Sequence, residues 1–298
     1  MTSQDLPLLS ASDIRTLADG LDLRPTKTLG QNYVIDPNTI RRIVSTAKLD
    51  ADEHVLEVGP GLGSLTLGLI DQAEAVTAIE IDPPVAAQLP ATIEQWRPGT
   101  AQRLAVLEAD AMHITGEQIV AAAPESADGP PTAIVANLPY NVAVPVMLHL
   151  LAELPSIEHG LVMVQHEVAE RLTAAPGSKI YGVPSVKMAW YANATLAGTI
   201  GTKVFWPAPR ITSGLVHFTA RKPPETTATR QQVFEVIDVG FAQRRKTMRA
   251  ALSTWAGSGA LAEEILVAAE VDPKARGEVL DIADFARIAE QHQARSTA

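Results

Sequence analysis

The sequence contains no cysteine among its 298 residues. Disulfide bonds, thiolate metal sites and cysteine nucleophiles are therefore excluded. Long hydrophobic runs are also absent, because no stretch approaches the ~18–20 uninterrupted apolar residues that a membrane-spanning helix needs. The first residues lack the basic start and apolar run of a signal peptide. These absences predict a protein of the cytoplasm.

Basic residues are fewer than acidic ones, with 24 lysines and arginines against 34 aspartates and glutamates. The formal net charge is −10, which by itself argues against a nucleic-acid partner. The charge is unevenly distributed, however, because the segment 239–262 holds four basic residues and no acidic one. We therefore expect a local basic stripe on an acidic protein.

Short apolar runs alternate with helical patterns through the first two-thirds of the chain. Helices are expected at 62–70 and from residue 83 onward, and Asp36 followed by proline is typical of a helix start. This alternation predicts an α/β fold with a parallel, doubly wound sheet. The expected strands are 54–58, 75–80, 104–108, 133–136 and 160–164.

A change in composition predicts a domain boundary near residue 223. The segment 223–229 reads Pro-Pro-Glu-Thr-Thr-Ala-Thr, which is typical of a linker, and the pattern after it is helical. We expect an α/β domain over 1–222 and a small all-helical domain over 223–298.

A glycine-rich turn follows the first expected strand. The segment 57–63 reads Glu-Val-Gly-Pro-Gly-Leu-Gly, and such glycines let the backbone approach a ligand closely. Glu80 ends the next strand, where the ribose hydroxyls of a nucleoside would lie, and Asp110 ends the strand after it. The pattern predicts an adenosine-type cofactor. The alternative is that the two acids only cap the following helices.

The segment Asn-Leu-Pro-Tyr at 137–140 ends the fourth expected strand. The Asn137 side-chain oxygen and a nearby backbone carbonyl can accept the two N–H bonds of the exocyclic amine of adenine. Tyr140 can stack on the base, as aromatic residues do for extruded bases. An ordinary turn with a buried tyrosine is the alternative.

These motifs resemble those of the ribosomal RNA adenine N6,N6-dimethyltransferases, which use S-adenosylmethionine. The resemblance runs from Thr28 to about Arg287. It rests on Leu-Gly-Gln-Asn-Tyr at 29–33, Glu-x-Gly-Pro-Gly at 57–61, Glu-x-Asp at 80–82, Asp-Ala at 110–111, Asn-Leu-Pro-Tyr-Asn at 137–141, Val-Phe-x-Pro-x-Pro at 204–209 with Ser213, and Phe-x-x-Arg-Arg-Lys-Thr-x-Arg at 241–249.

The resemblance implies a Rossmann-like methyltransferase that dimethylates N6 of two adjacent adenines in small-subunit rRNA. A monomer acting on rRNA or on an immature small subunit is expected. Independently of the resemblance, no metal is predicted, because the seven histidines include no pair at metal-ligand spacing. The target adenine would lie between Tyr140 and Phe205, although the latter also fits an apolar strand stiffened by prolines. The implied cofactor-binding residues are Asn32, Val34 (through its backbone), Gly59, Gly61, Glu80, Asp110 and Asn137.

Two positions depart from the family pattern. Tyr33-Val34 stands where the family usually has Phe-Leu, which keeps one aromatic and one aliphatic residue. Ile211-Thr212 stands where Val-Asp is usual, and Thr212 therefore receives no role.

The basic run at 244–249 is expected on a helix over 241–255. That helix would place its apolar residues on one face and Arg245, Lys246 and Arg249 beside it, and Arg244 completes the basic stripe. Because no acidic residue interleaves with the run, we expect an edge that binds RNA phosphates. A solvated charged face is the alternative.

Three other functions compete with this interpretation. A large-subunit rRNA methyltransferase of the antibiotic-resistance branch would be strongly basic, unlike this chain. A non-catalytic nucleic-acid-binding relative would not need an intact Asn-Leu-Pro-Tyr segment and cofactor turn. A nicotinamide oxidoreductase is disfavoured, because the third glycine comes one residue earlier than in the dinucleotide fingerprint.

Overall fold

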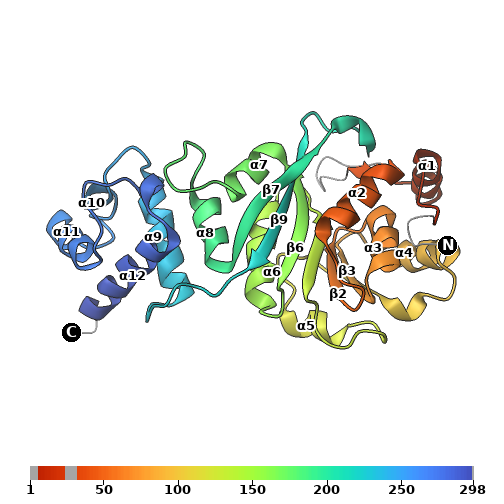
Figure 1. The fold of residues 1–298 in the computed structure, drawn as a ribbon, viewed down its shortest axis with the longest axis horizontal. Helices are drawn as coiled ribbons and strands as arrows, with labels where there is room; N and C mark the ends of the chain where they lie inside the picture. Colours follow the sequence, from red (N-terminus) through yellow and green to blue (C-terminus); the bar gives the residue numbers. More distant parts are fainter. Residues whose placement is uncertain (1–5, 24–31, 297–298) are drawn as a thin grey trace. The chain divides into compact units, whose positions relative to one another are not determined.

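A computed structural model gives the structure of residues 6–23 and 32–296. Seven of its strands form one sheet in the order β4-β3-β2-β5-β6-β9-β7, and β1 and β8 form a separate antiparallel ribbon (Figure 1). The strands are β1 (Tyr33–Val34), β2 (His54–Val58), β3 (Ala75–Glu80), β4 (Leu104–Glu108), β5 (Ala133–Asn137), β6 (His159–Gln165), β7 (Ala192–Ile200), β8 (Phe205–Trp206) and β9 (Ser213–Ala220).

The five strands predicted from apolar runs are confirmed as β2 to β6, and they pair in parallel. The sheet is nevertheless mixed, because β9 runs antiparallel to β6. β9 lies beside β7 and follows it through residues 201–212, which contain no crossover helix. A strand that returns without such a crossover must reverse its direction. The prediction of a wholly parallel sheet is therefore wrong at this edge.

The helices that connect the strands begin at recognisable caps. Asp36 accepts the N–H of Thr39 at 2.9 Å and starts α2, as predicted. No helix among residues 6–23 and 32–296 is long and apolar enough to cross a membrane. The helices are α1 (Ala11–Gly20), α2 (Pro37–Ala47), α3 (Ser64–Gln72), α4 (Pro83–Trp96), α5 (Gly116–Ala121), α6 (Ala143–Glu153), α7 (His166–Leu172), α8 (Val183–Tyr191), α9 (Arg230–Ala242), α10 (Met248–Ala251), α11 (Gly259–Ala268) and α12 (Ile282–Ser296).

One face of the sheet packs against helices α1 to α4 in a single buried cluster. Side chains alternate between the two faces of a strand, so Val55, Val76 and Leu161 reach this cluster from three strands. Helix α2 approaches α3 closely at Gly68, where a Cβ would lie 2.9 Å from Val44 Cγ2. This packing holds the sheet and its first helices as one rigid support.

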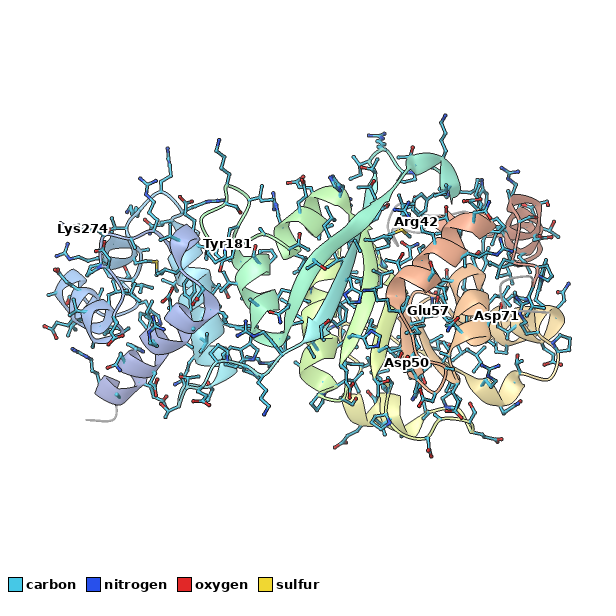
Figure 2. The ribbon with its side chains drawn as sticks, in the orientation of Figure 1. Arg42, Asp50, Glu57, Asp71, Tyr181 and Lys274 are labelled. Atoms are coloured by element: carbon cyan, nitrogen blue, oxygen red, sulfur yellow. The ribbon has the colours of Figure 1, made fainter. Side chains whose placement is uncertain are left out.

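The chain divides into two compact units. The first, the sheet unit, comprises Met1–Ala169 and Thr195–Ala220, and the second, the helical unit, comprises Glu170–Ala194 and Arg221–Ala298. Figure 2 labels Glu57 and Asp71 in the former and Tyr181 and Lys274 in the latter.

The helical unit has its own core, in which Tyr181 and Trp190 pack with Val233 and Phe285. These contacts explain why residues 170–194 cluster with the C-terminal helices, which the sequence did not indicate. A functional division into domains 1–222 and 223–298 stays a prediction.

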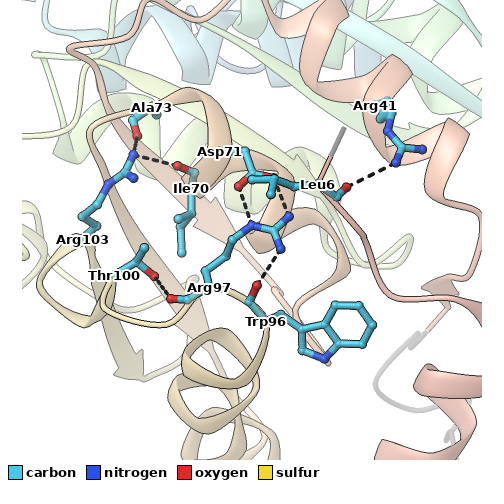
Figure 3. Close-up of polar contacts among 9 residues, drawn as sticks. All are labelled: Leu6, Arg41, Ile70, Asp71, Ala73, Trp96, Arg97, Thr100 and Arg103. Atoms are coloured by element: carbon cyan, nitrogen blue, oxygen red, sulfur yellow. Dashed lines mark hydrogen bonds and ion pairs between the residues drawn. The ribbon is translucent and has the colours of Figure 1, made fainter. Parts of the chain in front are cut away.

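A buried ion pair joins the C-terminal ends of α3 and α4 (Figure 3). Arg97 Nε and Nη2 each lie 2.6 Å from an oxygen of Asp71, and the two side chains are only 6% and 11% exposed. Arg103 donates to the carbonyls of Ile70 and Ala73, which end α3. Guanidinium groups thus satisfy the carboxylate and the last carbonyls of this helix.

We expect Asp71→Ala to lower the free energy of unfolding by about 3–5 kcal/mol, because it leaves the Arg97 guanidinium buried without its carboxylate. Denaturant unfolding followed by circular dichroism measures the loss. The matched control is Glu264→Ala, which breaks a pair whose side chains are 59% and 40% exposed and should cost less than about 1 kcal/mol. Equal losses in the two variants would contradict a structural role for the buried pair.

Candidate active site

A pocket opens at the carboxyl ends of β2, β3, β4 and β5. The strand order reverses between β2 and β5, and open α/β sheets bind ligands at such a switch point. Mostly apolar side chains with a few polar groups line the pocket, as is usual for ligand sites. Eight residues that the sequence singled out line it: Asn32, Val34, Gly59, Gly61, Glu80, Asp110, Asn137 and Tyr140.

The glycine turn forms the floor of this pocket. Gly59 and Gly61 have φ angles of 67° and 56°, in the left-handed region that favours glycine. The N–H of Gly59 donates to the carbonyl of Ile79 at 2.9 Å, which fixes the turn against β3. A Cβ on Gly61 would lie 2.8 Å from the Tyr33 ring. The turn therefore needs glycine for both its conformation and its packing.

Glu80 presents a buried carboxylate to the pocket. Its side chain is 6% exposed, and its two oxygens accept the N–H groups of Gly61 at 3.2 Å and Asp82 at 3.0 Å. Burial raises the pKa of Glu80, whereas these two hydrogen bonds oppose the shift. The bond to Asp82 fixes the turn before α4 and is no cap of that helix, whose first N–H groups donate to no side-chain cap. The bond to Gly61 ties the carboxylate to the glycine turn.

Asp110 lies at the end of β4, on the same rim. Its Oδ1 accepts the N–H of Met112 at 2.8 Å, which caps the turn that follows. Its Oδ2 lies 3.8 Å from Nε2 of the exposed His113. Because the Asp110 side chain is 42% exposed, capping leaves its carboxylate accessible from the pocket.

Asn137 and Tyr140 are oriented by contacts with distant parts of the chain. Asn137 Nδ2 donates to the carbonyl of Asn32 at 3.1 Å, and no described residue donates to its Oδ1. The amide oxygen is thus kept as an acceptor at the pocket. The Tyr140 hydroxyl lies 2.8 Å from Ser213 Oγ, a fully buried group at the start of β9. Ser213 therefore positions Tyr140, a role that the sequence motif did not indicate.

Phe205 is not brought together with Tyr140. It is 2% exposed, belongs to the core of the sheet unit and does not line the pocket. Its backbone pairs with Val34 in the β1–β8 ribbon, and this pairing directs the ring inward. The role of Phe205 in stacking on an adenine stays a prediction. Residues 29–31 of the first motif lie outside the described residues.

The basic run lies in the helical unit, at a break between two helices. Helix α9 ends at Ala242, and α10 begins anew at Met248 with Thr247 as its cap. The N–H groups of Met248 and Arg249 donate to the carbonyls of Ala275 and Pro273. A continuous helix would need those N–H groups for its own ladder, so the prediction of one helix over 241–255 is wrong.

The four basic residues differ in their partners. Arg244 pairs with Glu278 at 3.2 Å and Arg249 with Glu263 at 2.7 Å, so the expectation that acidic partners are lacking is wrong for these two. Arg245 and Lys246 are exposed, and neither has an ion-pair partner among residues 6–23 and 32–296. The latter two are therefore the stronger candidates for binding an external anion.

A mostly parallel sheet, a left-handed glycine turn and an acid at the end of the next strand define a Rossmann-like methyltransferase. The family model described as ribosomal RNA adenine dimethylase matches residues 23–292, and the chain belongs to this family.

Two curated relatives are similar over almost their whole length. A ribosomal RNA small subunit methyltransferase A from Arthrobacter sp. (strain FB24) is 65% identical over 97% of this chain and 94% of the relative. The protein of the same name from Thermobifida fusca (strain YX) is 60% identical over 97% of each chain.

Two solved structures share the fold. A dimethyladenosine transferase from Plasmodium falciparum matches with a TM-score of 0.70 at 20% identity, covering 88% of this chain and 97% of that one. The 23S rRNA methyltransferase ErmE matches with a TM-score of 0.61 at 24% identity, covering 88% and 100%. At these identities the two matches show the fold alone.

Glu57, at the start of the glycine motif and labelled in Figure 2, carries a buried carboxyl and is among the residues that line the pocket. Its side chain is 1% exposed, and Oε2 has no hydrogen-bond partner among the described residues. Burial, together with the negative charge of Glu80, raises the pKa of Glu57 to about 8. The folded protein therefore holds this carboxyl in its protonated form at neutral pH.

The raised pKa of Glu57 predicts a pH dependence of stability. Unfolding releases its proton above the ordinary carboxyl pKa, so the free energy of unfolding should fall by up to about 1.4 kcal/mol per pH unit until about pH 8. Glu57→Gln cannot ionise and should lose less stability than the wild type between pH 5.5 and 7.5. Denaturant unfolding at both pH values measures this, with the exposed Glu125→Gln as control. Parallel losses in wild type and Glu57→Gln would contradict the assignment.

Proposed function

We propose that this protein transfers methyl groups from S-adenosylmethionine to N6 of two adjacent adenines in small-subunit rRNA, two groups to each. The observation that carries the proposal is the orientation of the Asn137 amide. Its Nδ2 donates to the carbonyl of Asn32, so Asn137 Oδ1 is left as a hydrogen-bond acceptor. The names of the relatives at 60% and 65% identity support small-subunit rRNA as the substrate.

The pocket fits S-adenosylmethionine by the chemistry of its lining. The buried Glu80 carboxylate suits the ribose hydroxyls, and Asp110 suits the amine of the adenine. Apolar side chains such as Ile79, Ile81 and Ala111 line the same side and suit the faces of the base. The backbones of Gly59 and Gly61, with Asn32 and Val34, would hold the amino-acid portion.

The residues around the pocket contribute positioning and electrostatic support. Bound S-adenosylmethionine supplies an electrophilic methyl group on a positively charged sulfur. Asn137 Oδ1 accepts an N–H of the target amine, which draws its lone pair out of conjugation with the ring. Tyr140, fixed by Ser213, stacks on the base and keeps the nitrogen in line for displacement. With S-adenosylmethionine bound, these residues would hold the target nitrogen in line with its methyl group, and the proton displaced from the nitrogen would pass to water.

The second transfer relies more on stacking than the first. After one methyl group is attached, the target nitrogen keeps a single N–H for Asn137, and a methyl group takes the place of the other hydrogen. Orientation of the base then depends on Tyr140 and on an aromatic partner on its opposite face. Phe205 can take that place only if its ring leaves the core in which it is now buried.

The proposed substrate is rRNA in an immature small subunit, bound by a monomer in the cytoplasm. A large-subunit substrate is less well supported, because the match to ErmE at 24% identity concerns the fold. A non-catalytic nucleic-acid-binding protein would have no use for the oriented Asn137 amide and the acids around the pocket. In the helical unit, Arg245 and Lys246 are proposed to bind the RNA phosphates, with Arg244 and Arg249 beside them.

The direct test uses small ribosomal subunits from cells that lack this protein. The purified chain and S-adenosylmethionine are added, and the rRNA is digested for mass spectrometry. We expect dimethyladenosine to accumulate to two residues per subunit. Formation in large-subunit rRNA instead would favour the antibiotic-resistance branch, and binding of rRNA without methylation would favour a non-catalytic relative.

Asn137→Ala should lower the rate of methyl transfer by about 10²–10³-fold, because it removes an acceptor oriented toward the reacting amine. Quench-flow or time-course mass spectrometry of the rRNA measures the rate. Asn193→Ala, an exposed position on β7, is the matched control and should keep the wild-type rate. Near-normal turnover by Asn137→Ala would rule out this mechanism.

Replacing both Arg245 and Lys246 with alanine should weaken rRNA binding and flatten its dependence on salt. Each lost phosphate contact should reduce the slope of log affinity against log salt by roughly 0.7–0.9. Removing the same number of charges at the exposed Lys222 and Arg295 controls for net charge. Filter binding at several salt concentrations gives the slopes. An unchanged slope would show that these residues form only a solvated charged surface and do not bind RNA phosphates.

A further inference from the structure

Tyr33 carries a buried hydroxyl that the proposed mechanism does not use. The side chain is 8% exposed and lines the pocket, yet its oxygen has no hydrogen-bond partner among the described residues. Buried polar groups are nearly always hydrogen-bonded, and an exception needs an explanation. The sequence motif offers none, because the family usually has phenylalanine here.

The Tyr33 ring is held in place from two sides. It stacks on Trp206 with the ring centroids 6.3 Å apart, and the backbones of the two residues pair in the β1–β8 ribbon. On the other side the ring contacts the glycine turn, where a Cβ on Gly61 would lie 2.8 Å from Tyr33 Cε1. The ring therefore has little freedom to carry its hydroxyl to another protein partner.

Tyr33 and the carboxylate that suits the ribose both contact the same glycine. Gly61, which the ring contacts, donates its N–H to Glu80 at 3.2 Å. Burial raises the pKa of Tyr33, and the negative charges of Glu80 and Asp82 raise it further. The phenol is therefore protonated at neutral pH and can act as a hydrogen-bond donor.

We propose that Tyr33 is a cofactor-binding residue whose hydroxyl donates a hydrogen bond to a ribose hydroxyl oxygen of S-adenosylmethionine. The same ribose hydroxyl donates its own O–H in a hydrogen bond to the Glu80 carboxylate. A hydroxyl has one proton and two lone pairs, so it can donate to a carboxylate and accept from a phenol at once. The inference rests on the proposed function, since it requires S-adenosylmethionine in this pocket.

Isothermal titration calorimetry with S-adenosylhomocysteine tests the proposal on the full-length chain. Tyr33→Phe should weaken binding by about three- to tenfold, the effect of one neutral hydrogen bond. The 2′,3′-dideoxy analogue of S-adenosylhomocysteine lacks the acceptor, so wild type and Tyr33→Phe should bind it equally. Equal affinities for S-adenosylhomocysteine itself would overturn the proposal. So would an undiminished loss with the dideoxy analogue, which would indicate a change in packing.

Thermal unfolding gives a second readout that separates binding from folding. Tyr33→Phe removes a buried hydroxyl without a partner, so the ligand-free variant should melt at the wild-type temperature or above it. The rise in melting temperature on adding S-adenosylhomocysteine should nevertheless be smaller than in the wild type. A less stable ligand-free variant with a full rise would contradict the proposal.

Tyr181→Phe is the matched control in the helical unit. Its hydroxyl donates to the carbonyl of Leu280 at 2.9 Å, so this variant should lose stability and keep the wild-type affinity for S-adenosylhomocysteine. Failure of the wild type itself to bind S-adenosylhomocysteine would count against the proposed function. Binding by the wild type with equal affinity of Tyr33→Phe would count against the role of Tyr33 alone.

Discussion

The left-handed turn between β2 and α3 is the constraint on which the pocket depends. Through Gly59 it bonds to the backbone of β3, and through Gly61 it bonds to the Glu80 carboxylate. The same Gly61 gives room for the Tyr33 ring, which belongs to a segment before the sheet. One backbone turn thus fixes the relative positions of β3, the Glu80 carboxylate and the Tyr33 ring. This conformation is accessible to glycine and strained for other residues. The turn therefore positions its neighbours through backbone N–H groups and not through side chains.

The sequence predicts those parts of the fold in which local pattern and tertiary environment agree. Strands β2 to β6 are apolar runs, largely buried on both faces in all but β4, which is partly exposed, and their bounds are within one residue of the expected ones. Strand β7 was missed because many of its residues are exposed, and β1 and β8 are too short for any periodicity. The break before α10 depends on the carbonyls of Pro273 and Ala275, which no local pattern around residue 248 can indicate.

In the candidate site, the sequence identified most of the residues but not how they are oriented. Motif spacing identified Glu80 and Asn137, which lie at the ends of strands that the sequence predicts. The orientation of Asn137 comes from a backbone carbonyl 105 positions earlier, and that of Tyr140 from a hydroxyl 73 positions later. Phe205 was placed beside the target base by motif, whereas its strand pairing buries it in the core. Local sequence patterns cannot predict such contacts between residues far apart in the chain.

The β1–β8 ribbon has a consequence for the order in which the protein is completed during synthesis. Residues 33–34 leave the ribosome early, but the strand that holds them, Phe205–Trp206, follows about 170 residues later. A nascent chain that ends before β8 already contains β2 to β5, the glycine turn and Asn137. It still lacks the partner that fixes the wall formed by Tyr33 and Val34. Closure of the pocket is therefore a late event in biogenesis, although most of its residues are among the first to be made.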